Sequence, residues 1–168
     1  MKKLDGYERV IHPLNPFYEK DSKILILGSF PSIKTREYGF FYGHPQNRFW
    51  KLMEILFNTS LSRDIDERKK FLSENKIALY DSIFQCDIIM SSDSSIKNVV
   101  LSDIESIIKN SEIREVFLNG ATSYKYFKKN NLKDFSIRGI KLPSTSPLNA
   151  RYSLDDLVDS WKIILSYL

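Results

Sequence analysis

The apolar run Ile24-Leu25-Ile26-Leu27, which ends at Gly28, constrains the fold of this chain more than any other stretch. Because no polar residue interrupts it, the run predicts a strand that is buried on both faces, as in a parallel sheet covered by helices. A helix-period pattern follows, in which the apolar residues at i, i+3, i+4 and i+7 are Phe49, Leu52, Met53 and Leu56. The connection between the two, about nineteen residues, is longer than most and therefore suggests function.

Short apolar runs and helix-period segments alternate along the rest of the chain. Further strands are indicated at 77–80, 115–118 and 137–142. Helices are expected at about 47–57, 64–75, 121–130 and from Ser153 onward. The capping-box spacing of Ser102 and Glu105 predicts one more helix, which begins at Ser102. Residues 1–22 are expected to be extended, and the serine-rich residues 85–98 to form an irregular loop.

This alternation predicts a single α/β domain over residues 1–168: a three-layer α/β/α sandwich around a short, mainly parallel four-stranded sheet. The carboxyl ends of parallel strands lie at one edge of a sheet, where ligands bind in folds of this class. The polar segments expected at that edge are 29–47, Asp81-Ser82, Asn119-Gly120 and 144–151. These segments are the predicted site.

Composition and charge narrow the class of protein only slightly. The net charge of +4 is compatible with a nucleic-acid partner, although many soluble enzymes are equally basic. The single cysteine, Cys86, excludes an internal disulfide and suits a reducing compartment; we expect it in the core. Neither a signal peptide nor an apolar run of membrane-spanning length is visible, so a cytoplasmic protein is expected.

Several common catalytic motifs are missing from the sequence. It has no G-x-G-x-x-G or Walker-A pattern for nucleotide phosphates. It has no G-x-S-x-G elbow either, because Phe30 stands where the nucleophile would be and Ser29 comes one place early. With His12, His44 and Cys86 as the available soft ligands, a closed zinc site is not expected. The alternative of a small-molecule hydrolase is therefore not supported by any catalytic triad in the sequence.

Three stretches of the sequence resemble the uracil-DNA glycosylase superfamily, and most of all its hypoxanthine-DNA (deoxyinosine) glycosylase branch. They are Gly28–Ser32, Tyr42–Trp50 and Ser144–Arg151, and the resemblance covers essentially residues 20–168. The H-P-x-N-R-F-W string is shared with the mismatch-specific branch. The resemblance implies a monomeric, monofunctional DNA glycosylase without metal or organic cofactor, which excises a deaminated base, hypoxanthine first, from double-stranded DNA and leaves an abasic site.

Two departures from the superfamily's motifs bear on its substrate. Uracil-specific members carry Asp in the first motif (G-Q-D-P-Y) and mismatch-specific members carry Asn (G-I-N-P-G), whereas this chain has Phe30. Uracil-specific members begin the second motif with His, and the aligned residue here is Ser144. Ordinary uracil excision is therefore expected to be poor. A mismatch-specific uracil or thymine glycosylase and a non-catalytic nucleic-acid-binding module of the same fold remain as alternatives.

The resemblance to the hypoxanthine branch assigns the catalytic role to Asn47. Hydrolysis of an N-glycosidic bond develops positive charge on the sugar and negative charge on the leaving base. A neutral amide can hold a water beside the sugar, while the backbone N–H groups of Gly28, Ser29 and Phe30 stabilise the departing base. The simpler interpretation is that Asn47 caps the helix that follows it, and both roles can hold together.

The remaining site residues divide between the base and the DNA backbone. Tyr42, or less directly Phe41, is the candidate ring for stacking on a flipped base, although most aromatic residues belong to cores. Asp81 aligns with a base-reading Asn of the uracil-specific members and would accept N1–H of hypoxanthine; otherwise it is a turn residue. His44 would bind the base or a phosphate, or else satisfy a loop carbonyl.

The second motif is expected to contact DNA. Ser144 and Ser146 suit phosphates beside the lesion, and Leu148 would be the wedge that replaces the extruded nucleotide unless it packs into the core. Arg151 is expected to form a phosphate-facing stripe with four lysines, each of which is equally well explained as solvated surface: Lys125, Lys128, Lys129 and Lys141. The predicted DNA-binding set is Ser144, Ser146, Pro147, Leu148, Asn149 and Arg151.

Overall fold

A computed structural model of the chain describes residues 5–134 and 136–168. Its central sheet has four parallel strands in the order β3-β2-β6-β7. Their bounds are Ile24–Gly28 for β2, Ile77–Asp81 for β3, Glu115–Asn119 for β6 and Ile140–Leu142 for β7. Every residue of β2, β3 and β6 is buried, as uninterrupted apolar runs predict. The predicted four-stranded parallel sheet is confirmed.

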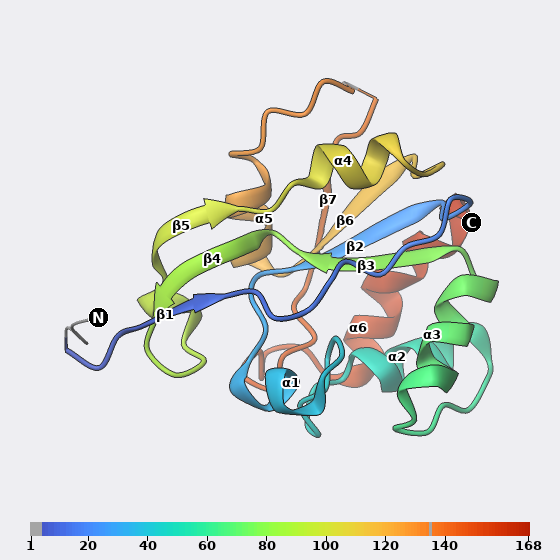
Figure 1. Cartoon of the computed structure of the whole chain (residues 1–168). Coiled ribbons are helices and arrows are strands. Elements are labelled where there is room, and N and C mark those ends of the chain that lie inside the picture. The colour runs from blue at the N-terminus through green and yellow to red at the C-terminus, as the bar shows by residue number, and fades with distance from the viewer. Residues whose placement is uncertain (1–4, 135) are drawn as a thin grey trace.

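Helices cover both faces of this sheet, which makes the predicted three layers. In Figure 1, α4 (Ile104–Lys109) lies above the sheet, whereas α2 (Phe49–Phe57), α3 (Ile65–Glu74) and α6 (Leu154–Trp161) lie below it. The short helix α5 (Ala121–Phe127) packs against β6 and β7. A 3₁₀ segment, η2 (Lys162–Tyr167), continues α6 to the end of the chain. No helix in the described ranges is both long enough and apolar enough to span a bilayer.

A second sheet, which the sequence did not predict, lies beside the first. Its antiparallel strands are β1 (Glu8–Ile11), β4 (Ile83–Ile88) and β5 (Lys97–Leu101), in the order β1-β4-β5 (Figure 1). The prediction of an irregular loop at 85–98 is therefore wrong for most of that stretch. Register shifts in the β4–β5 pairing separate the buried Ile83 from the next buried residue, Cys86, by three positions instead of two. Such bulges erase the period-two pattern by which a strand is recognised.

The long connection after β2 is also more regular than expected. It contains α1 (Ile33–Tyr38), whose N-cap Ser32 accepts a hydrogen bond from the Thr35 N–H and whose C-cap Gly39 is left-handed. For α4 the predicted cap is wrong by one residue, because the Asp103 side chain, not that of Ser102, accepts from the Ser106 N–H. The predicted start of the last helix is confirmed by a capping box between Ser153 and Asp156.

Candidate active site

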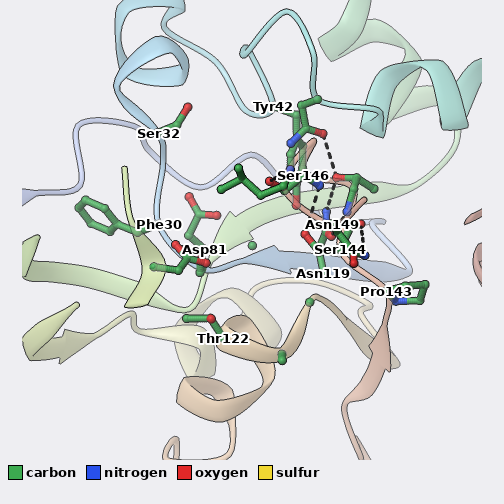
Figure 2. A pocket seen from close by; sticks show the side chains of 18 of the residues that line it. Phe30, Ser32, Tyr42, Asp81, Asn119, Thr122, Pro143, Ser144, Ser146 and Asn149 are labelled. Carbon is green, nitrogen blue, oxygen red and sulfur yellow. Dashed lines mark hydrogen bonds between the residues drawn. The ribbon is translucent and has the colours of Figure 1, made fainter. Parts of the chain in front are cut away.

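A pocket of about 700 Å³ opens at the carboxyl ends of the parallel strands. All four polar segments expected at this edge contribute to its wall (Figure 2). The sequence-predicted site residues that line it are Gly28, Ser29, Phe30, Tyr42, Asn47, Asp81, Ser144, Ser146, Leu148, Asn149 and Arg151. A cavity of this volume at this place is typical of a small-ligand site in an α/β fold.

Gly28 leaves room for two side chains at the inner wall of the pocket. A Cβ atom at this position would collide with Oδ1 of Asp81 and lie 3.4 Å from the Tyr42 hydroxyl. The Tyr42 ring stacks on Phe49 with centroids 4.1 Å apart. Its hydroxyl is buried without a hydrogen-bond partner in the described residues, and this burial, followed by the charge of Asp81, raises the pKa of Tyr42. An aromatic ring and a carboxylate therefore adjoin each other in the pocket wall at Gly28.

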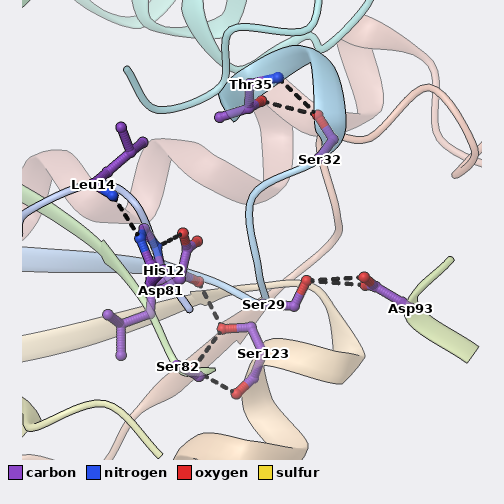
Figure 3. A network of polar contacts seen from close by, with 10 residues as sticks. His12, Leu14, Ser29, Ser32, Thr35, Asp81, Ser82, Asp93 and Ser123 are labelled. Carbon is purple, nitrogen blue, oxygen red and sulfur yellow. Dashed lines mark hydrogen bonds and ion pairs between the residues drawn. The ribbon is translucent and has the colours of Figure 1, made fainter. Parts of the chain in front are cut away.

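His12 contacts the Asp81 carboxylate and holds it in place, although the sequence indicated no role for His12 in the site. Its Nε2 lies 2.6 Å from Asp81 Oδ2, and its Nδ1 accepts the Leu14 backbone N–H at 3.1 Å (Figure 3). His12 follows β1 directly, so it reaches the site from the unpredicted antiparallel sheet. No local pattern in the sequence pairs it with a residue 69 positions away.

Asn47 ends a chain of hydrogen bonds that links three segments of the protein. Its Oδ1 accepts the Phe49 backbone N–H at 2.9 Å and the Thr145 hydroxyl at 2.8 Å. Thr145, which is fully buried, in turn accepts from Nδ2 of Asn119 at 3.0 Å and donates its own N–H to Oδ1 of Asn119. Asn47 thus lines the pocket and also accepts the N–H of the first residue of α2, although the N-cap position itself is Arg48 and the predicted capping role is shifted by one residue. Two donors fill the acceptor positions of its Oδ1, and none of the described residues accepts from its Nδ2.

A second carboxylate, Asp93, also lines the pocket and was missed because it lies within the stretch predicted to be an irregular loop. The Ser29 hydroxyl donates to it, with Oγ 3.0 and 3.2 Å from the two carboxylate oxygens (Figure 3). Although Asp93 is an exposed residue, the loss of water around its carboxylate and, after it, the charge of Asp81 raise its pKa; the Ser29 hydrogen bond opposes this shift and solvent screening keeps it small.

Arg48 fastens the second motif to the beginning of α2. Its guanidinium donates to the backbone carbonyls of Ser146 at 2.8 Å and Asn149 at 3.0 Å, and to those of Thr145 and Tyr152. The loop so held carries Leu148, which is 87% exposed beside the pocket. A large apolar side chain in that position is available to a ligand and adds nothing to the core.

Other predicted residues lie outside the main pocket. His44 lines a neighbouring cavity of about 200 Å³, and its Nδ1 accepts the Gln46 N–H. Pro147 is exposed at the tip of the second loop. Of the proposed basic stripe, Arg151 and Lys141 line the pocket, whereas the others are exposed on or just after α5: Lys125, Lys128 and Lys129.

The described residues offer neither a reactive thiol nor a cluster of metal ligands. Burial raises the pKa of the Cys86 thiol to about 11, which suits the core residue predicted from the sequence and not a nucleophile. Within residues 5–134 and 136–168, no three His, Cys, Asp or Glu side chains gather closely enough to bind a metal ion.

Comparisons with known proteins agree with the motifs. The family model of the Uracil DNA glycosylase superfamily matches residues 16–165. A Hypoxanthine DNA glycosylase from Methanosarcina barkeri is 33% identical over 117 residues, which are 66% of this chain and 72% of that protein. Another from Methanosarcina acetivorans is 30% identical over 137 residues, 80% of this chain and 85% of the relative.

A solved structure has the same fold. The solution NMR structure of a candidate uracil DNA glycosylase from Methanosarcina acetivorans superposes with a TM-score of 0.74 at 25% identity, over 90% of this chain and 96% of the other. The resemblance predicted from the three motifs is confirmed. The chain belongs to the uracil DNA glycosylase superfamily.

Proposed function

We propose that this protein is a monofunctional DNA glycosylase that hydrolyses the N-glycosidic bond of deoxyinosine in double-stranded DNA, releases hypoxanthine and leaves an abasic site. The observation that carries the proposal is the pocket in which Asn47, fixed by Thr145, and Asp81, fixed by His12, line the same cavity. Two similar proteins named Hypoxanthine DNA glycosylase support it. Phe30 and Ser144 stand where uracil-specific members carry Asp and His.

Asn47 contributes to catalysis as a hydrogen-bond donor. The sequence predicted only that the amide would hold the attacking water; its oxygen already accepts two hydrogen bonds, so Nδ2 is the group left for the reactants. A donor can position a water through the water's oxygen but takes no proton from it. The water therefore attacks after the sugar cation has largely formed, when little help from a base is needed.

The departing base leaves with negative charge, which the first motif stabilises. The backbone N–H groups of Ser29 and Phe30 donate to no other described residue, and both residues line the pocket. Backbone donors fixed in place before the reaction cost no reorganisation when charge develops. These two N–H groups lower the energy of the anionic base and so favour cleavage of the glycosidic bond.

Tyr42 and Asp81 recognise the base. The Tyr42 ring, supported by Phe49, stacks against the flipped base and recovers part of the few kcal/mol that flipping costs. Asp81 accepts N1–H of hypoxanthine, whereas the O4 atom of uracil would face the carboxylate unfavourably.

The second loop binds the DNA duplex. Ser144 and Ser146 contact phosphates beside the lesion, and the exposed Leu148 enters the base stack in place of the extruded nucleotide. The protein acts as a monomer on one lesion at a time.

The proposal is tested with the purified chain on duplexes that each hold one hypoxanthine, uracil, xanthine or mismatched thymine, followed by alkaline cleavage of abasic sites. We expect release of hypoxanthine to be fastest. Faster release of uracil or mismatched thymine would favour the mismatch-specific alternative. Tight binding to abasic DNA without release of any base would favour the non-catalytic module and overturn the proposal.

A further inference from the structure

His12 is a buried residue that fixes Asp81 but has no further role in the proposed function. It precedes residues 16–165, which match the superfamily, so the family match does not account for it. Its side chain is completely buried, and its ring packs against Tyr80 at 4.8 Å and edge-on against Phe30 at 5.7 Å between centroids. These aromatic contacts hold the imidazole in one orientation beneath the pocket.

The hydrogen bonds of His12 define which ring nitrogen carries the proton. A backbone N–H can only donate, so Nδ1, which accepts from Leu14, is unprotonated. The proton of the neutral ring is therefore on Nε2, which donates to Oδ2 of Asp81 at 2.6 Å (Figure 3). One oxygen of the carboxylate is thus permanently engaged.

The other oxygen, Oδ1, is directed to the space that Gly28 leaves open beside the pocket. No described residue donates a hydrogen bond to it, and the Asp81 side chain is only 7% exposed. The pocket thus contains one oriented acceptor with very little freedom to turn. A ligand that fills the pocket displaces water from this oxygen, so a ligand that brings a donor is favoured, since leaving the oxygen unpaired is costly.

We propose that His12 is a positioning residue for base specificity: by fixing Asp81 it makes the pocket select purines with a hydrogen on N1, such as hypoxanthine, over adenine. This inference rests on the proposed function. The N1 of adenine is an unprotonated acceptor, so its lone pair would face Oδ1 and both acceptors would stay unpaired. Sites built around a required hydrogen bond reject analogues that lack it by factors of about 10⁴. Normal adenine in DNA is thereby spared.

The direct test is a double-mutant cycle with single-turnover release of hypoxanthine as the measurement. His12→Leu should lower the single-turnover rate by about 10- to 100-fold, the loss typical when a contacting group is misplaced. His12→Gln, whose amide can donate to Asp81, should recover part of the activity. In an Asp81→Asn background, His12→Leu should have little further effect. Equal losses in both backgrounds would mean that His12 only stabilises the N-terminal segment, and the inference would be overturned.

Two further measurements do not depend on base release, so the inference can fail separately from the proposed function. In an Asn47→Ala background, His12→Leu should reduce the ratio of affinities for duplexes holding one hypoxanthine and duplexes holding adenine in its place. An unchanged ratio would contradict the inference. Because the sequence has two histidines, imidazole ¹H–¹⁵N NMR can assign each ring. His12 should be the Nε2–H tautomer, and the Nδ1–H tautomer would also contradict it.

Discussion

At the scale of single residues, the orientation of Asn47 depends on the hydroxyl of Thr145. That hydroxyl donates to Asn47 and accepts from Asn119, so the buried Thr145 connects the beginning of α2 with the end of β6. An amide held by one rigid partner on each side keeps its free Nδ2 in place without the substrate.

We therefore expect Thr145→Val, which preserves shape but removes the hydroxyl, to lower the single-turnover rate of hypoxanthine release by about 10- to 100-fold. The unpaired Asn119 donor should also cost about 1–3 kcal/mol of unfolding free energy. Thr145→Ser keeps the hydroxyl and is the matched control. If the Val variant releases hypoxanthine as fast as the Ser variant, the hydrogen-bond chain does not position Asn47.

Asp93 leads to a prediction about how the stability of the folded protein depends on pH. Because its pKa is raised in the folded protein, the folded state holds this proton more tightly than the unfolded state. Stability is therefore lost as pH rises from the ordinary carboxyl pKa through the raised one, and the loss persists above it. Because Asp93 is exposed and water screens its charge, this loss is small; Asp93→Asn removes it, so its melting temperature should exceed that of the wild type slightly more at about pH 7 than at about pH 3.5. Thermal unfolding at both pH values checks this, and a difference independent of pH would contradict it.

At the scale of elements, Arg48 at the N-cap of α2 holds the second loop, to which we assign the wedge. Four backbone carbonyls of residues 145–152 accept from Arg48. The loop therefore keeps its shape although the Leu148 side chain does not pack into the core. A wedge must be stiff, because a flexible side chain would give way to the base stack.

Leu148→Ala should accordingly slow hypoxanthine release from duplex DNA by about tenfold, since the shortened side chain recovers less of the few kcal/mol spent on flipping. Release from a single-stranded substrate, which has no stack to open, should change little. Leu165→Ala, at an exposed position of η2, is the control and should leave both rates unchanged. Equal slowing on both substrates would assign Leu148 to another role.

At the scale of the whole molecule, the elements that could be predicted are those that a local sequence pattern encodes. The uninterrupted runs at 24–27, 77–80 and 115–118 are strands of the parallel sheet, and its topology brings their polar ends into one pocket. The antiparallel sheet was missed because bulges in β4 disrupt its alternation. His12 and Asp93 were missed with it, since each reaches the pocket through that sheet or its connecting loop.

The central claim is that an amide on the pocket wall, without a carboxylate in the first motif, completes the cleavage of a base from its sugar. The most direct measurement is the single-turnover rate of hypoxanthine release from a deoxyinosine duplex by Asn47→Ala, compared with the wild type and with Asn110→Ala at the remote end of α4. We predict a loss of at least about 100-fold for Asn47→Ala, with the fold retained by circular dichroism, and no loss for the control. A folded Asn47→Ala variant that releases hypoxanthine at a near-wild-type rate would contradict this account.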